Sequence, residues 1–411
     1  MTTQNDAQRP LPEMMAELET AIRAHDHERA TQLEQIILQR LATDAAENAT
    51  LERRVRALMQ ELQQAEASDI QLKSFDPFDL ERSALEDKVY PVWFGTNRKP
   101  DSQGGGFTGE RNDRITRGRV EVFVPKSHRF GELGNSLWGR LRRLKLRDDR
   151  LRIQQITQQE QAAFFAELQQ TMQDARDNGV PPHALFFLHG FNVTFEEAAI
   201  RAAQIGFDLG APLTAFFSWP SRGSVRMYTV DEASIEASER AITDFLIEFT
   251  AQCKADKIHV IAHSMGNRGL LRALQRIAAN AETRGQVKFG QIFLAAPDVD
   301  RDLFLDLAQL YAEHSDRTTL YASGADLPVH VSSKLHDAPR AGYFKPYTIA
   351  PGMDTIAVPD FDLDLLGHAY FAQAEALLYD IGGLMRDDKA PPRQRLETVK
   401  YEGGTYWQLR R

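Results

Sequence analysis

The sequence predicts an α/β fold, in which a mostly parallel sheet with an antiparallel start carries helices on both faces, preceded by an N-terminal helical segment. Near-continuous apolar runs alternate with amphipathic stretches of helical length, and strands of that kind are buried on both faces, as in a parallel sheet. These runs are ALFFLHG, TAFFSWP, KIHVIAHS, QIFLAAPD, TTLYAS and DTIAVPD. Three strand-like runs, VYPVWFG, GRVEVFVP and LRIQQI, come before this alternation begins and predict the antiparallel start.

The chain of 411 residues is long enough for one large domain and smaller parts, which we assign to residues 1–70, 86–388 and 389–411. Residues 1–70 show helical spacing and almost no strand signal. Within them a seam at heptad spacing predicts either a helical hairpin packed on the main domain or a short coiled-coil arm. As an arm, residues 11–66 would serve a second copy of the chain or a partner protein. Residues 389–411 contain two short strand-like runs around Gly403 and Gly404, which predict a hairpin. The seam consists of Leu51, Val55, Leu58, Leu62 and Ala65.

Composition narrows the function and the location. The net charge is −9, with 49 basic and 58 acidic residues, which argues against a nucleic-acid partner. A single cysteine, Cys253, rules out an intrachain disulfide, and the N-terminus lacks the basic and apolar segments of a signal peptide. No apolar run approaches the length of a bilayer span. We therefore expect a protein without a transmembrane segment, located in the cytoplasm.

Ser264 stands between the strand-like KIHVIAH and the helix-like NRGLLRALQRIA. A serine at a sharp strand-to-helix turn presents its hydroxyl oxygen as a nucleophile, and small residues must flank it because the two backbones nearly touch. Ala262 and Gly266 occupy the two flanking positions where the usual pattern has glycine twice. The alternative is a serine that only caps the helix. A nucleophilic serine also needs a base and an acid that orients the base.

Candidates for both roles follow later strands, in the chain order serine, acid, histidine that this kind of site requires. His368, just before the last helix, is the candidate base. Asp326 follows TTLYAS and is the preferred acid, while Asp298 at the end of QIFLAAPD is the alternative. The carboxylate would hold the imidazole in the required tautomer and stabilise its charged form.

A tetrahedral intermediate carries negative charge on oxygen and therefore needs preorganised N–H donors. The backbone N–H of Met265 is one candidate, and the HGFN turn supplies a second from Phe191 or Asn192. Four further residues near strand ends are candidates for contacting the substrate. Each of them could equally well have a role in structural packing. They are His189, Trp219, Arg222 and Tyr228.

Taken together, HGFN, FSWPSRG, AHSMGN, LAAPDVD, YASGAD and LGHAYF resemble the α/β-hydrolase superfamily, in particular a bacterial esterase/lipase-like branch of largely uncharacterised hydrolases. The resemblance covers roughly residues 88 to 385. It implies an α/β-hydrolase fold with Ser264 as nucleophile, His368 as base, Asp326 or Asp298 as acid, and an oxyanion hole. It further implies hydrolysis of a small-molecule or lipid ester through an acyl-enzyme intermediate, without a cofactor.

Other functions remain open alternatives. The same residues would serve an amidase, a thioesterase or a phospholipase, and a non-catalytic protein could act through its N-terminal helices. No metal site is expected, because His25 and His27 lie two apart on a helix and DFDLDLLG lacks the glycine and glutamate of a calcium loop.

Overall fold

The structure is a computed structural model that describes residues 88–102, 105–125, 151–222, 227–323, 338–343, 347–358, 371–393, 395–401 and 404–410, with six residues of the N-terminal part. The chain divides into two compact units, Met1–Leu85 with Ser136–Leu146 and Glu86–Asn135 with Arg147–Arg411. In the first unit the described residues are helical, and Arg29 forms an ion pair with Glu17 at 2.7 Å. The predicted heptad seam lies outside the described residues. The six N-terminal residues are Met14, Glu17, Arg29, Leu33, Ile36 and Ile37.

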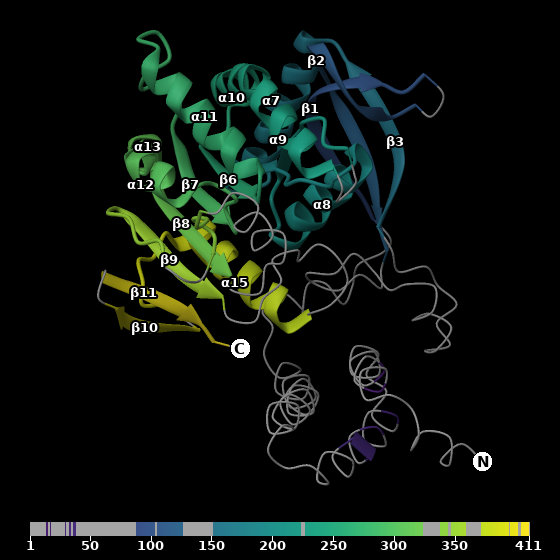
Figure 1. The fold of residues 1–411 in the computed structure, drawn as a ribbon. Helices are drawn as coiled ribbons and strands as arrows, with labels where there is room; N and C mark the ends of the chain where they lie inside the picture. The colour runs from purple at the N-terminus through teal and green to yellow at the C-terminus, as the bar shows by residue number, and fades with distance from the viewer. Residues whose placement is uncertain are drawn as a thin grey trace, which may run out of the picture. The chain divides into compact units, whose positions relative to one another are not determined.

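The second unit is built on an 11-stranded sheet with the order β10-β11-β9-β8-β7-β6-β4-β5-β1-β2-β3 (Figure 1). The first three strands are β1 (Lys88–Pro100), β2 (Phe107–Val124) and β3 (Arg152–Gln159), and both pairs among them are antiparallel. β1 then pairs in parallel with β5 (Leu213–Ser218), and the parallel order continues to β9 (Met353–Val358). Between them lie β4 (His183–Leu188), β6 (Lys257–His263), β7 (Phe289–Ala295) and β8 (Ser315–Ser323). The predicted fold class, an antiparallel start followed by a parallel sheet, is confirmed.

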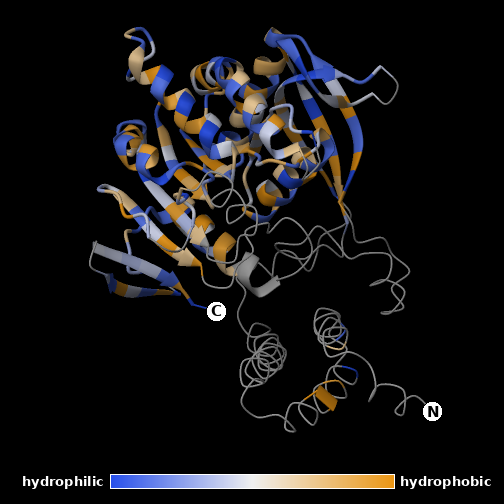
Figure 2. Cartoon of the chain, viewed as in Figure 1, coloured by the Kyte–Doolittle hydropathy of each residue, from blue (hydrophilic) through white to orange (hydrophobic). Residues whose placement is uncertain are grey.

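Helices cover both faces of this sheet (Figure 1). Those of one face are α7 (Gln161–Asp177), α9 (Tyr228–Ala237), α10 (Glu239–Gln252), α11 (Gly266–Ala279), α12 (Arg301–Leu307) and α13 (Gln309–His314), which share one hydrophobic core. On the other face α8 (Phe195–Asp208) and α15 (Phe371–Asp387) share a second core. β4 supplies both cores by strict alternation, with Phe186 in the first and Phe187 in the second. This two-sided burial explains why the parallel strands are rich in apolar residues, which appear in orange in Figure 2.

The last described residues extend the sheet at one edge. β10 (Leu396–Tyr401) and β11 (Gly404–Leu409) pair antiparallel, and β11 pairs in parallel with β9 through Trp407 and Ile356. Residues 396–401 and 404–409 are therefore part of the same sheet and of the same compact unit as the parallel strands.

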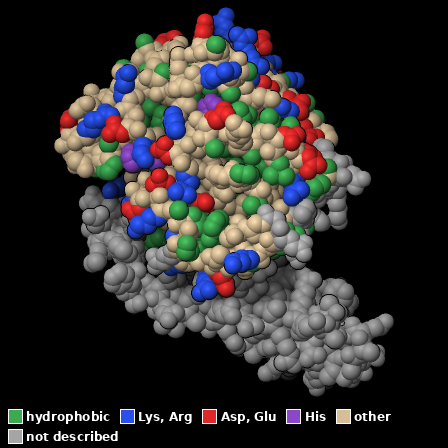
Figure 3. Space-filling view, turned by 90° about the vertical axis from the view of Figure 1, so that its left-hand side faces the viewer, with side chains coloured by type: hydrophobic (Ala, Val, Ile, Leu, Met, Phe, Trp, Pro, Cys, Tyr) green, Lys and Arg blue, Asp and Glu red, His purple; other side chains and the backbone are tan. Residues whose placement is uncertain are grey.

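The surface of this unit mixes polar and apolar side chains. Basic and acidic side chains occupy the face shown in Figure 3, with hydrophobic side chains between them. Within the described ranges, no helix is both long and apolar enough to cross a bilayer.

Candidate active site

Ser264 lies at a sharp turn between β6 and α11. Its backbone has a φ of 47°, in the left-handed region that costs a residue with a Cβ atom on the order of 1 kcal/mol. The turn is fixed by hydrogen bonds on both sides: the Ser264 N–H donates to Ala295 O at 2.9 Å, and Ser264 O accepts from Asp298 N at 3.1 Å and from Asn267 Nδ2 at 3.0 Å. A strained conformation held in this way is typical of functional positions.

The helix that follows is not capped by the serine side chain. The N-cap residue of α11 is Met265, and no side chain makes a capping hydrogen bond there. The alternative reading of Ser264 as a capping residue therefore has no support in the geometry. Ser264 is 4% exposed, so a substrate would have to reach it through the residues around the strand ends.

Two glycines allow the neighbouring turn to approach Ser264. A Cβ atom on Gly266 would lie 2.5 Å from His189 O and 2.7 Å from Leu188 O, both backbone atoms at the end of β4. A Cβ atom on Gly190 would lie 3.0 Å from the Ser264 Cβ. The HGFN turn thus packs directly against the serine, which is the contact that an oxyanion hole requires.

The backbone amides of this region differ in availability. Asn192, which has a φ of 58°, donates its N–H to Asp231 Oδ2 at 3.2 Å. Among the residues that the structure describes, neither Met265 nor Phe191 has an acceptor for its N–H. Of the two donors that the HGFN turn offers, Phe191 is therefore the available one, and the amide of Asn192 is already engaged.

His189, the first residue of the HGFN turn, packs against Trp219. Their rings stack at 5.1 Å, the Trp219 indole N–H donates to His189 O at 2.8 Å, and both residues are almost wholly buried. Burial lowers the pKa of His189 well below its ordinary value, and the positive charge of Arg98 lowers it further. His189 is therefore a neutral residue that supports the HGFN turn, and neither ring is placed to contact a substrate in this conformation.

Asp298, the alternative acid, is 1% exposed and bonded to several groups. Its carboxylate accepts a hydrogen bond from the Tyr228 hydroxyl and forms ion pairs with Arg268 at 3.3 Å and Arg340 at 3.5 Å. Arg268 also donates to Glu232 on α9, and although burial lowers its pKa, the nearby Asp298, Tyr228 and Glu232 raise it above its ordinary value. This network ties the strand end after β7 to α9 and α11, and it places Tyr228 in packing rather than in an open site.

The remaining predicted residues fall in two groups. Arg222 is exposed, and its backbone N–H donates to Asp231 Oδ1 at 2.9 Å. Asp326 and His368 lie outside the described residues. The strands before them, β8 and β9, end at the same edge as β6, since the register aligns His263 with Ala295, Ala295 with Tyr321, and Tyr321 with Ile356.

Among the described residues, no group of acidic, histidine or cysteine side chains is arranged to hold a metal ion.

Two buried charged residues at this edge were not predicted. Asp231 on α9 is fully buried and accepts the amides of Asn192 and Arg222. Arg98 on β1 is 1% exposed and donates to Ser218 Oγ at 2.8 Å, Ser221 O at 2.9 Å and Val193 O at 2.8 Å. The available signal for Arg98 was its place three residues after the apolar run VYPVWFG, while Asp231 lies within a helix with no distinguishing pattern.

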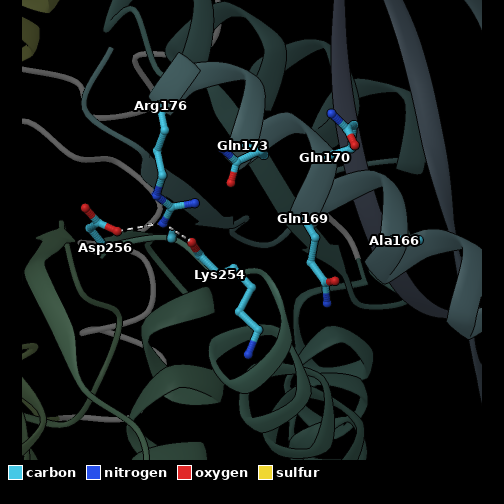
Figure 4. Close-up of a pocket in the computed structure, with 8 residues that line it drawn as sticks. Ala166, Gln169, Gln170, Gln173, Arg176, Lys254 and Asp256 are labelled. Carbon is cyan, nitrogen blue, oxygen red and sulfur yellow. Dashed lines mark hydrogen bonds and ion pairs between the residues drawn. The ribbon is translucent and has the colours of Figure 1, made fainter. Parts of the chain in front are cut away.

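A depression of about 680 Å³ lies elsewhere, between α7 and the segment that enters β6 (Figure 4). Arg176 crosses it and donates to Lys254 O at 2.6 Å and Asp256 Oδ1 at 2.7 Å. β6 starts beside this depression and ends at His263, next to the serine. The depression and Ser264 therefore lie at opposite ends of the strand. Its glutamines and paired charges include no nucleophile, so we do not assign the reaction to it.

Comparison with known proteins gives one family match. Residues 160–383, more than half of the chain, match the model of the family described as alpha/beta hydrolase of unknown function (DUF900). None of the curated proteins is similar in sequence to this chain.

Several solved structures are distant matches to this chain. An uncharacterized protein from Bacillus cereus ATCC 10987 is 12% identical over 50% of this chain, with a TM-score of 0.33, and this chain spans 60% of that protein. Esterase B from Lactobacillus rhamnosis is 11% identical, with a TM-score of 0.33 and coverage of 80% of this chain and 96% of that one. Phospholipase PlaB from Legionella pneumophila is 12% identical, with a TM-score of 0.29 and coverage of 56% and 67%. At such TM-scores the likeness carries no argument about function.

Proposed function

Because the chain belongs to the family of alpha/beta hydrolases of unknown function, we propose that it is a serine hydrolase that cleaves a carboxylic ester through an acyl-enzyme intermediate. The observation that carries the proposal is the backbone conformation of Ser264, which is left-handed and lies at the junction of β6 and α11. Gly190 and Gly266 allow the HGFN turn to pack closely against this junction. A serine in this conformation presents its hydroxyl away from the sheet.

In the proposed reaction Ser264 Oγ attacks the ester carbonyl carbon while His368 takes the hydroxyl proton. The carbonyl oxygen gains negative charge and accepts hydrogen bonds from the N–H groups of Met265 and Phe191. His368 then gives its proton to the leaving alcohol, and a water molecule, deprotonated by the same imidazole, releases the acid and regenerates the serine. Asp326 is the proposed acid that orients the imidazole.

The contacts of Asp298 are the reason for preferring Asp326. A triad carboxylate must accept the N–H of the imidazole, whereas the Asp298 carboxylate already accepts from the Tyr228 hydroxyl and lies in ion pairs with Arg268 and Arg340. These three partners already fix the carboxylate in place, and breaking buried ion pairs of this kind is costly. We assign Asp298 to holding the loop after β7.

Location and assembly complete the proposal. We propose a cytoplasmic protein, because a chain with a single cysteine has no intrachain disulfide and therefore no need of an oxidising compartment. That cysteine, Cys253, is buried, and burial raises the pKa of its thiol to about 11. Residues 11–66 are the proposed surface for a second copy of the chain or a partner protein.

Labelling with a fluorophosphonate probe tests the proposed function, with wild type, Ser264→Ala and His368→Ala compared at equal concentration and confirmed to be folded. We expect labelling of the wild type, none of Ser264→Ala, and a strong reduction for His368→Ala. A panel of p-nitrophenyl esters, an anilide, a thioester and phospholipid vesicles would then separate ester hydrolysis from the other substrates that the same residues could serve. Folded wild type that neither labels nor hydrolyses any of these would overturn the proposal and favour an interaction protein.

A further inference from the structure

The carboxylate of Asp231 is the centre of a buried hydrogen-bond group beside the HGFN turn. Its Oδ2 accepts the Asn192 N–H at 3.2 Å and the Ser221 hydroxyl at 2.5 Å, and its Oδ1 accepts the Arg222 N–H at 2.9 Å. The side chain is fully buried on α9, the helix that follows β5. Three donors from two different strand-end loops therefore converge on one carboxylate.

The contact with Asn192 determines the orientation of the turn. Fixing the Asn192 N–H fixes the plane of the peptide between Phe191 and Asn192, because the peptide unit is rigid. The positive φ of Asn192, 58°, is a conformation that a free chain rarely adopts, so it needs such a contact to persist. The preceding peptide carries the Phe191 N–H, whose direction follows from the same backbone.

A second contact from the same helix acts on the same turn. The Phe191 ring packs edge-on against the ring of Tyr228, the first residue of α9, with centroids 5.2 Å apart. Tyr228 in turn donates to Asp298, whose backbone N–H donates to Ser264 O at 3.1 Å. Helix α9 is thus joined both to the turn that carries Phe191 and to the turn that carries Ser264.

Arg98 and Ser221 bind the backbone of Val193, the residue that follows the HGFN turn. Arg98 donates to Val193 O at 2.8 Å, while Val193 N–H donates to Ser221 Oγ at 3.1 Å. Burial lowers the pKa of Arg98 to about 10, and the nearby acidic side chains, Asp231 among them, counteract this effect. The N–H groups of Asn192 and Val193 and the carbonyl of Val193 are therefore bonded to buried side chains.

We propose that Asp231 is a positioning residue for the oxyanion hole: by accepting the Asn192 N–H it holds the HGFN turn so that the Phe191 N–H is directed, together with that of Met265, toward the carbonyl oxygen of the bound ester. The inference rests on the proposed function, since it assigns a role within that same site. Asp231 does not touch the substrate and acts through the backbone of the turn.

Three variants and one matched control test this role. Asp231→Ala removes all three acceptor contacts, whereas Asp231→Asn keeps one oxygen for Asn192 and Ser221 and loses the contact with Arg222. Asp208→Ala is the control, because Asp208 is also buried and hydrogen-bonded, to Gln204, but stands at the far end of α8. The fourth protein, Ser221→Ala, removes the hydroxyl that joins the carboxylate to Val193.

The readouts are the rate constant of phosphonate labelling, kcat and KM for p-nitrophenyl butyrate, and the Tm of each variant. We expect Asp231→Ala to lower kcat and the labelling rate about 10- to 100-fold with KM within about threefold, since loss of one whole oxyanion donor costs about 100- to 1000-fold. Asp231→Asn should stay within about fivefold of wild type. Asp208→Ala should lower the Tm while its kcat remains close to that of wild type.

Two outcomes would overturn the inference while leaving the proposed function intact. One is wild-type labelling of Ser264 in Asp231→Ala, and the other is an equal loss of kcat in Asp208→Ala, which would indicate general destabilisation. If Asp231→Ala does not fold, Asp231→Ser takes its place, with the same expected loss and the same refuting result. Ser221→Ala, which keeps the contact between Asp231 and Asn192, should lose less activity than either variant. Failure of the wild type to label at all would count against the proposed function first.

Discussion

Replacing Gly266 by alanine tests whether close packing at the turn between β6 and α11 is required for activity. The added Cβ atom would lie 2.5 Å from His189 O and 2.7 Å from Leu188 O. Both neighbours are backbone atoms at the end of a central strand, so neither can rotate away as a side chain would. Relief requires the HGFN turn and the start of α11 to move apart by several tenths of an ångström.

The expected cost follows from this overlap. Overpacking of a buried position costs about 1–3 kcal/mol, from which the better helix propensity of alanine recovers up to about 1 kcal/mol. Activity should suffer more than stability, because a displacement approaching 1 Å at a reacting centre can cost about 100-fold in rate. We expect Gly266→Ala to lower the phosphonate labelling rate about 10- to 100-fold and the free energy of unfolding by about 1–2 kcal/mol.

Gly383 on α15 provides the matched control, because a Cβ atom there would meet no atom within 4 Å. Gly383→Ala should keep the wild-type labelling rate and raise the free energy of unfolding by up to about 1 kcal/mol. Labelling rates and urea unfolding curves of the two variants are compared with wild type. If Gly266→Ala labels as fast as wild type, activity does not depend on close contact between the HGFN turn and the start of α11, and our interpretation of the turn at Ser264 is wrong.

Two further predictions concern stability. Because Ser264 has a φ of 47°, Ser264→Gly should be more stable than Ser264→Ala by roughly 1 kcal/mol in urea unfolding; equal stability would show that the backbone relaxes in the variants. Burial, with the positive charges of His183 and Lys257, lowers the pKa of His259 to about 3, so this residue stays neutral when folded and is protonated below about pH 6.5 when unfolded. Its contribution to stability is therefore complete above about pH 6.5 and is lost as the pH falls toward 3, by on the order of 2 kcal/mol at pH 5. His259→Asn should unfold more easily at pH 7 but lose about that much less stability between pH 7 and pH 5, and parallel pH profiles of the two proteins would contradict this assignment.

The strands and the sharp turn at Ser264 could be predicted because both depend on residues that are neighbours in the sequence. β4 to β9 are apolar on both faces, so their runs stand out, and the small residues around Ser264 follow from how closely a strand and a helix approach at a tight turn. The sequence could not show which of Phe191 and Asn192 has its backbone N–H free of an acceptor among the described residues and is therefore the one that we propose as oxyanion donor. That choice depends on Asp231, which lies 39 positions after Asn192 and reaches it only in the folded chain.

The two aspartates after β7 and β8 show the same limit. In the sequence each follows a strand, so Asp326 is preferred as the triad acid and Asp298 stays an alternative. What the structure adds concerns Asp298, whose partners are distant in the sequence: Arg268 and Tyr228 come from two helices, and Arg340 comes from a segment that also hydrogen-bonds to the loop after β7 through Ala341 and Val299. A carboxylate held by these groups is suited to fixing a loop, whereas a triad acid must keep an oxygen for the imidazole. By this reasoning Asp298 stabilises the surroundings of Ser264, and the acid that we propose for the reaction is Asp326.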